Sequence, residues 1–142
     1  MKLFKRMFTV ILSVLMAMSC ILPAYAADAR LNHGININYT FGINDTGYAE
    51  LAMSYSANPD TFTNIRMESC IQKRSLGFIW TKVENGAYDD TWIDSSTEDG
   101  GMFVRGMQLD STGTYRAVFK VTISGTGAAD DVLEEKITDT YE

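Results

Sequence analysis

Histidine, cysteine and proline are scarce in this chain, which has one His, two Cys and two Pro among its 142 residues. Because His33 is the only imidazole, the sequence argues against histidine-based catalytic triads and histidine-rich metal sites. Apolar residues (46%) and aromatic residues (11%) are not scarce, and this excludes intrinsic disorder. The length fits one small globular domain.

A long apolar run is also missing. The longest run, residues 7–22, has about 16 residues, whereas a membrane-spanning helix needs roughly 20. It follows a basic N-terminus and precedes Ala24-Tyr25-Ala26, which is the order of features in a secretory signal peptide. We therefore expect residues 1–26 to be a signal peptide cleaved near Ala26. The product is then secreted, and is either extracellular or loosely associated with the cell wall, with no membrane span.

Cys20 offers an alternative, which is a lipid-anchored product. It follows Ala17-Met18-Ser19, so Ala occupies the third position before the cysteine, where a lipoprotein signal favours Leu. The residues after Cys20 also continue the apolar run instead of starting a polar tether. Secretion after cleavage near Ala26 is the stronger interpretation.

Positive charge is scarce once the signal peptide is removed. The signal peptide holds three of the 12 basic residues and none of the 18 acidic ones, which leaves nine basic residues and a net charge of −9. So acidic a domain is expected to be a poor partner for nucleic acid or for an anionic membrane.

Cys70 is the only cysteine left after cleavage, so no intramolecular disulfide can form. The alternation of its segment groups it with polar residues such as Glu68 and Gln72, which predicts an accessible thiol. That thiol is either inert because neighbours shield it, or half of an intermolecular disulfide. The second alternative predicts a Cys70-linked homodimer.

Apolar and polar residues alternate with period two through most of the remaining chain, and no segment shows a sustained helical period. Asn85-Gly86 is a hairpin turn signal, and residues 94–101 have the composition of a polar loop. The acidic tail, residues 128–142, fits an edge strand or a short helix, and we favour the edge strand because dense charge protects an edge from aggregation. After an irregular leader at 27–34, we expect the other strands at 35–43, 49–55, 63–73, 78–83, 87–93, 102–109 and 115–124.

Seven or eight short strands with frequent turn signals are typical of an antiparallel β-sandwich. Residues 111–115 match the tyrosine corner of immunoglobulin-like sandwiches, in which a Tyr opens a strand and its hydroxyl bonds back to the preceding turn. Here Gly113 lies in the turn and Tyr115 opens the strand. The prediction is therefore an all-β fold, a single antiparallel immunoglobulin-like β-sandwich over residues 35–142.

The same motif assigns three further structural residues. Ala117 takes the position at which antibody domains carry their second cysteine. Trp80 is the candidate for the core tryptophan, and Met67 is the candidate for the position of the first cysteine. With Met67 and Ala117 in place of a disulfide, the two sheets would be held together by packing alone.

The signal peptide, the alternating first strand and the segments 71–74, 77–80 and 113–116 together resemble small secreted β-sandwich proteins of Gram-positive bacteria, which are uncharacterised. The resemblance covers most of the mature chain, but its motifs are mainly those of strands and turns. It implies the fold and the location, and it brings no activity, cofactor or functional residue.

Tyr88 and Trp92 are the large aromatic residues that the alternation does not place in the core. They lie four residues apart, on one face if the segment is extended, and Asp89 and Asp90 between them could bond to sugar hydroxyls. One interpretation is a ligand platform made by these four residues. The other, which we favour, is that Trp92 closes the end of the sandwich.

Acidic residues cluster in the expected loops, but their spacing fits no known calcium loop. In Asp94-Ser95-Ser96-Thr97-Glu98-Asp99-Gly100 the glycine is one position late and the terminal Glu is missing. We therefore favour a solvated surface over a metal site, and expect no cofactor. No nucleophile has a candidate base, so we expect no enzyme activity.

The sequence thus predicts a secreted, non-enzymatic binding or interaction module at or near the bacterial cell envelope, with a protein or glycan partner. A carbohydrate-binding module that uses an aromatic platform is the first alternative. A small secreted hydrolase is the second, and it would require a carboxylate pair in a cleft.

Overall fold

The computed structural model describes residues 31–142, so the expected signal peptide and residues 27–30 of the leader lie outside the described residues. The prediction of an all-β chain is confirmed, because this part of the chain contains eight strands and a single turn of 3-10 helix, η1 (Tyr88–Asp90). None of its helices is long and apolar enough to cross a membrane. The strands are β1 (Asn36–Ile43), β2 (Tyr48–Ser56), β3 (Phe62–Ser75), β4 (Ile79–Lys82), β5 (Trp92–Ser96), β6 (Gly100–Gln108), β7 (Gly113–Gly125) and β8 (Asp131–Tyr141).

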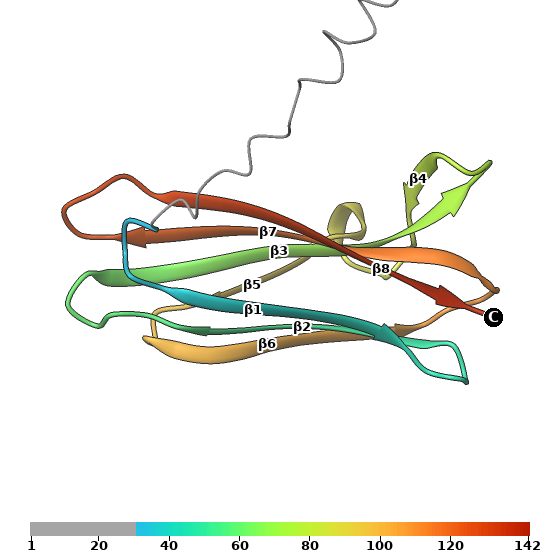
Figure 1. Ribbon diagram of the computed structural model, residues 1–142, viewed down its shortest axis with the longest axis horizontal. Helices are drawn as coiled ribbons and strands as arrows, with labels where there is room; N and C mark the ends of the chain where they lie inside the picture. The colour runs from blue at the N-terminus through green and yellow to red at the C-terminus, as the bar shows by residue number, and fades with distance from the viewer. Residues whose placement is uncertain (1–30) are drawn as a thin grey trace, which may run out of the picture. The chain divides into compact units, whose positions relative to one another are not determined.

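The strands form two antiparallel sheets, which confirms the predicted sandwich. Sheet A has the order β1-β2-β6, and sheet B has the order β4-β3-β7-β8. β5 also pairs with β3, through residues 65–69, while β4 pairs with residues 72–75 of the same strand. β7 occupies the opposite edge of β3. The short strands β4 and β5 therefore lie along the same edge of β3. The two layers are seen edge-on in Figure 1.

The core lies between the sheets and follows the period-two pattern of the sequence. The inward residues of β2, β3 and β7 are fully buried, among them Leu51, Ile71 and Phe119. Inward residues of the edge strand β1 are only partly buried, although the ring of Tyr39 lies 5.1 Å from that of Phe119. The alternation therefore predicts the core residues correctly. The inward residues of β1 are less buried than those of β2, β3 and β7 because β1 lies at the edge of its sheet.

On each open side of the sandwich, a polar contact joins a strand of sheet A to a strand of sheet B. On one side the Ile43 amide of β1 donates to the Asp139 carboxylate of β8 at 2.8 Å. On the other, the Arg105 guanidinium of β6 donates twice to the Asp94 carboxylate of β5, at 2.6 and 3.1 Å. A bidentate arginine-carboxylate pair fixes geometry as well as charge, so it ties the short strand β5 of sheet B to β6 of sheet A.

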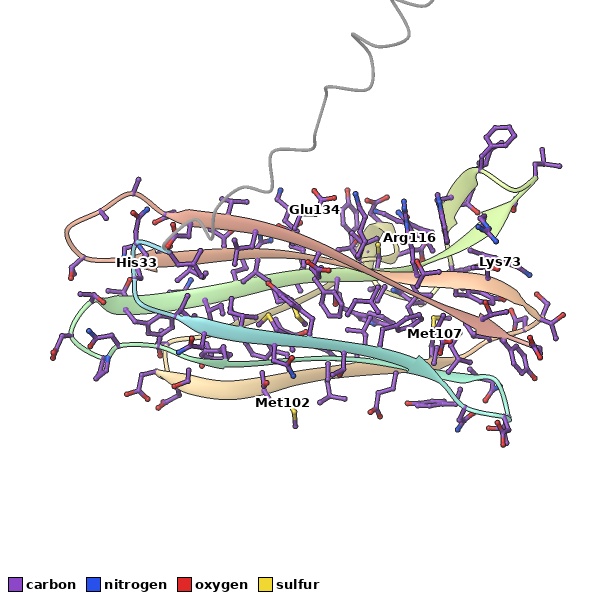
Figure 2. All side chains as sticks on the ribbon, viewed as in Figure 1. His33, Lys73, Met102, Met107, Arg116 and Glu134 are labelled. Atoms are coloured by element: carbon purple, nitrogen blue, oxygen red, sulfur yellow. The ribbon has the colours of Figure 1, made fainter. Side chains whose placement is uncertain are left out.

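His33 belongs to the irregular leader, as expected, but its side chain is fully buried. The His33 ring Nε2 lies 3.1 Å from the Ala129 carbonyl oxygen, and the Thr61 hydroxyl donates to the His33 carbonyl. Gly125 leaves the space for this ring, since a β-carbon there would overlap the imidazole and the Thr61 carbonyl. Residues 31–34 are thereby fixed to one end of sheet B, where Figure 2 labels His33.

The chain between β4 and β6 differs from the prediction. The predicted strand 87–93 is interrupted, because Asp89 and Asp90 have left-handed φ angles of 50° and 49° and form η1, so that only Trp92 and Ile93 are in a strand, as the start of β5. Asn85 supports this turn, since its side-chain amide donates to the Asp90 carbonyl at 3.0 Å. Asp and Asn tolerate such angles better than most residues, and β5 therefore occupies part of the segment predicted as a polar loop, 94–101.

The tyrosine-corner hydrogen bond is present. The Tyr115 hydroxyl donates to the Ser111 carbonyl at 2.5 Å, and the side chain is buried. Gly113 has a φ of 145° in the turn, a conformation that side chains rarely adopt. The Lys73 ammonium lies 5.4 Å from the centre of the tyrosine ring and covers its outer end.

Three structural assignments made from this motif need correction. Met67 and Ala117 are both fully buried, but they lie on β3 and β7 of the same sheet, where Met67 pairs with Val121 and Ala117 with Ile71. They therefore cannot stand for a pair that joins the two sheets. Trp80 is not a core residue, because the short strand β4 places it beside Arg74 and Arg116 on the outside of sheet B.

We predict that Tyr115→Phe lowers the free energy of unfolding by about 1 to 3 kcal/mol, because the buried Ser111 carbonyl loses its donor. The fold should be retained, since the ring remains. Denaturant melts of the variant, beside Tyr88→Phe as a control on an exposed tyrosine, measure this difference. Equal midpoints for Tyr115→Phe and the parent would contradict the assigned role of this hydrogen bond.

Candidate functional site

The proposed platform of Tyr88 and Trp92 is not assembled. Tyr88 is 94% exposed in η1, whereas Trp92 is partly buried and packs against the core at the edge of β3. The Asp89 carboxylate already accepts from the Lys82 ammonium at 2.6 Å, and the Asp90 carboxylate accepts from the Asn85 amide at 3.2 Å. The turn at η1 thus separates the two rings, and the favoured interpretation, in which Trp92 closes the sandwich, fits this arrangement.

Cys70 lies on the outer face of β3, in the predicted phase, but the prediction of an accessible thiol is wrong. Only 6% of the residue is exposed. Val118, its partner on β7, and Lys82 and Thr91 surround it at the floor of a hollow of about 190 Å³. Burial raises the pKa of the Cys70 thiol, and the nearby Lys82 and Arg116 only partly oppose that effect. Such a thiol is a poor group for disulfide exchange, so the structure does not support a Cys70-linked homodimer.

The most exposed apolar residues of the described chain include those at the tip of the β3–β4 hairpin. We call residues 72–82 the finger. Leu76 is 82% exposed, Phe78 is 76% exposed and Ile79 is 41% exposed. Figure 1 shows this hairpin rising away from sheet B, and Figure 2 shows its side chains projecting into solvent.

The finger projects because β3 is longer than its pairing with β7. That pairing ends at Lys73, opposite Tyr115, whereas β3 continues to Ser75 with β4 as its partner. Leu76 and Gly77 both have left-handed φ angles, 52° and 81°, which suit a tight hairpin turn. Leu pays a conformational cost there that Asn or Gly would not. The chain thus exposes an apolar side chain at a position where a polar one would be more stable.

Two arginines hold the base of the finger. The Arg116 guanidinium lies 4.3 Å from the centre of the Trp80 ring, and that of Arg74 lies 5.8 Å from it. Arg116 also donates to the Gln72 side chain at 2.8 Å, and Arg74 donates to the Thr114 hydroxyl at 3.2 Å. Cation–π contacts and hydrogen bonds together restrain the stem and tie β4 to β7.

Most of the described cations share the outer face of sheet B, although the domain as a whole is acidic. Their side chains alternate with the buried residues of β3 and β7 or continue the same face onto β4 and β8. Figure 2 shows Arg116 and Glu134 on the side of sheet B that is turned away from sheet A. We call this surface the basic face, and its cations are Arg66, Arg74, Lys82, Arg116, Lys120 and Lys136.

Half of these cations are already neutralised by carboxylates. Arg66 pairs with Glu68, Lys82 with Asp89 and Lys136 with Glu134. Within residues 31–142, no carboxylate lies within ion-pair distance of Arg74, Arg116 or Lys120. The unpaired positive charge therefore includes both arginines at the base of the finger.

No three metal-ligating side chains of residues 31–142 lie close enough together to hold an ion. Among the buried polar groups, the Tyr39 hydroxyl has no partner in the described chain, and burial, with a smaller contribution from Glu135, raises its pKa to about 12. A phenol with that pKa stays neutral at physiological pH, so Tyr39 is not poised as a base.

The finger was not predicted from the sequence. Two features of the sequence indicated it: the turn residues 74–77 and the loss of clean alternation over residues 78–83. The alternation fails there because β4 pairs on only one edge and has no sheet packed over it, so both of its faces tolerate either kind of residue.

We predict that Trp92→Ala lowers the free energy of unfolding by about 2 to 4 kcal/mol, because it removes a large side chain packed on the core. Tyr88→Ala should change it by less than about 0.5 kcal/mol, since that ring is exposed. Thermal melts compare the two. If Trp92→Ala leaves the free energy of unfolding unchanged, the interpretation of Trp92 as part of a ligand platform is favoured again.

We also predict that a small thiol reagent labels Cys70 only after unfolding, because the thiol is covered and largely protonated at neutral pH. The control is a Cys70→Ser variant that carries Ser95→Cys, at an exposed position of β5. It should react at once in the folded state. Equal labelling rates for the two proteins would show that Cys70 is open to solvent.

Comparisons with known proteins add no family. No protein-family model matches the sequence, and a search of curated proteins finds no match. Any statement about function therefore depends on the surfaces described above.

Proposed function

We propose that this chain is an exported, non-enzymatic binding module, and that the finger is the element with which it binds a protein partner at the bacterial cell envelope. The exposed apolar tip is the observation on which this proposal depends. Leu76 and Phe78 would lose exposed apolar area on binding, and each fully buried side chain of this size is worth about 1.5 to 3 kcal/mol. The conformational cost of a Leu in the left-handed conformation at the tip is explained if a partner covers its side chain.

The base of the finger defines the chemistry of the partner. Arg74 and Arg116 are unpaired cations beside the apolar tip, so a complementary surface has an apolar pocket with carboxylates at its rim. Apolar anchors in pockets supply most of the affinity of such interfaces, while rim charges speed and orient the encounter. The restrained stem reduces the entropy that binding would cost.

The location and the fold family are part of the same proposal. Residues 1–26 have the order of features of a signal peptide, which supports export. The tyrosine-corner hydrogen bond and the strand order, in which β6 returns beside β2 and β7 lies between β3 and β8, support an immunoglobulin-like arrangement. They agree with the resemblance to secreted β-sandwich proteins of Gram-positive bacteria.

A binding assay on intact cells tests the role of the finger. We expect the fluorescently labelled, secreted protein to bind cells of the producing species, and the double variant Leu76→Asn, Phe78→Ser to lose about ten-fold or more in affinity. Asn suits the left-handed position, so this variant should unfold no earlier than the parent.

The matched control is Ile93→Ser with Val132→Ser, two exposed apolar residues of sheet B that are not part of the finger. It should bind as the parent does. If the finger variant and the control bind equally well, the finger is not the contact element.

A further inference from the structure

The outer face of sheet A differs in chemistry from the basic face. It is built from the outward residues of β1, β2 and β6, which are mostly Asn, Ser, Thr, Ala and Gly. Glu50 is its one ionisable carboxylate, and no Lys or Arg lies on it, since Arg105 belongs to the inward phase of β6. Met102 lies on this face and points away from the sandwich in Figure 2.

Tyr48, at the start of β2, lies across this face. The outer atoms of its ring and its hydroxyl oxygen are 2.5 to 2.9 Å from the point where Gly106 of β6 would carry a β-carbon. The missing side chain at Gly106 therefore lets the ring lie against the sheet. Since 42% of Tyr48 is exposed, the opposite face of the ring remains open to solvent.

The position of Tyr48 is fixed by the preceding turn. The Asn44 side chain accepts a hydrogen bond from the Tyr48 amide at 2.9 Å, and the Asn44 amide donates to the Tyr48 carbonyl at 3.0 Å. The same Asn44 oxygen also accepts from the Thr46 hydroxyl at 2.8 Å. These bonds fix the backbone of Tyr48, while the ring itself lies against Gly106, so it loses little freedom when a ligand stacks on it.

A hollow of about 480 Å³ adjoins Tyr48, over the outer face of the paired strands β1 and β2. It exists because Gly42 has no side chain, and a β-carbon at Gly42 would meet no atom within 4 Å. Polar groups at its border include the Glu50 carboxylate and the Thr40 hydroxyl. Glu50 has no ion-pair partner within residues 31–142, so its oxygens are free to accept hydrogen bonds.

We propose that this hollow binds a neutral sugar unit of a glycan chain, with the sugar ring stacked on Tyr48 and its hydroxyls bonded to Glu50 and Thr40. A flat, open aromatic ring beside hydroxyl and carboxylate groups matches a ligand that is apolar on its ring faces and hydroxylated at its rim. The lone negative charge of Glu50 and the absence of cations disfavour anionic sugars.

This site is independent of the finger, because it lies on the other sheet. It also differs from the aromatic platform expected from the sequence, which used Tyr88 and Trp92. The carbohydrate-binding alternative is thus placed at a new location. This site depends on Tyr48 and on two glycines, since Gly106 leaves space for the tyrosine ring and Gly42 leaves space for the ligand.

Calorimetric titration of the secreted protein with cellohexaose, chitohexaose and mannohexaose tests the proposal. We expect at least one of these neutral oligosaccharides to bind with a dissociation constant in the millimolar range or below. Tyr48→Ala should weaken that binding about ten-fold or more, while Tyr48→Phe should stay within about three-fold of the parent.

Gly42→Gln is the second variant, and it keeps the test decisive if Tyr48→Ala is unstable. It should fold, because the added side chain enters open space, and it should abolish binding by filling the hollow. Val132→Ser, at an exposed position of β8 on the opposite sheet, is the control and should bind within about two-fold of the parent. The proposal is overturned if none of the three sugars binds, or if binding survives in both Tyr48→Ala and Gly42→Gln.

Discussion

The antiparallel ladder of β3 is the element on which the rest of the structure depends. Its inward residues supply the centre of the core, and its outward residues contribute to the basic face. β7 lies along one edge, while β4 and β5 share the other. At 14 residues it also outruns its pairing with β7, and this overhang, closed by β4, makes the finger. One strand therefore determines the core, the charge distribution and the projecting tip.

The two outer faces of the sandwich have different chemistries. On sheet B, cations gather around an aromatic stem, whereas sheet A offers small uncharged side chains and one tyrosine lying over a glycine. Residues 31–142 hold eight basic and 17 acidic residues, and this net charge of −9 describes neither face. A two-layer fold permits this division because the residues of each strand alternate between core and solvent, so that each sheet has its own outer surface.

Local chemistry was enough to predict the sandwich, the core residues of β2, β3 and β7, and the Tyr115 turn. It was not enough where segments distant in the sequence determine whether a side chain is exposed or buried. Cys70 has the predicted phase, but Thr91 and Lys82 from a later segment cover it. The sequence did not distinguish Trp80, which lies on the outer face of sheet B on the short strand β4, from Trp92, which packs against the core from β5. The ring of Tyr48 needs Gly106, 58 positions away in the sequence.

The central claim is that the overhang of β3 holds an apolar tip for a partner to bind. Photo-crosslinking in producing cells tests it most directly, with a photoreactive amino acid at position 78 in one strain and at position 88 in another. Both positions are exposed, Phe78 in the turn between β3 and β4 and Tyr88 in η1, but only the first belongs to the finger. The account predicts a discrete covalent adduct with an envelope protein from position 78 and none from position 88. Adducts from position 88 alone, or from neither position, would contradict it.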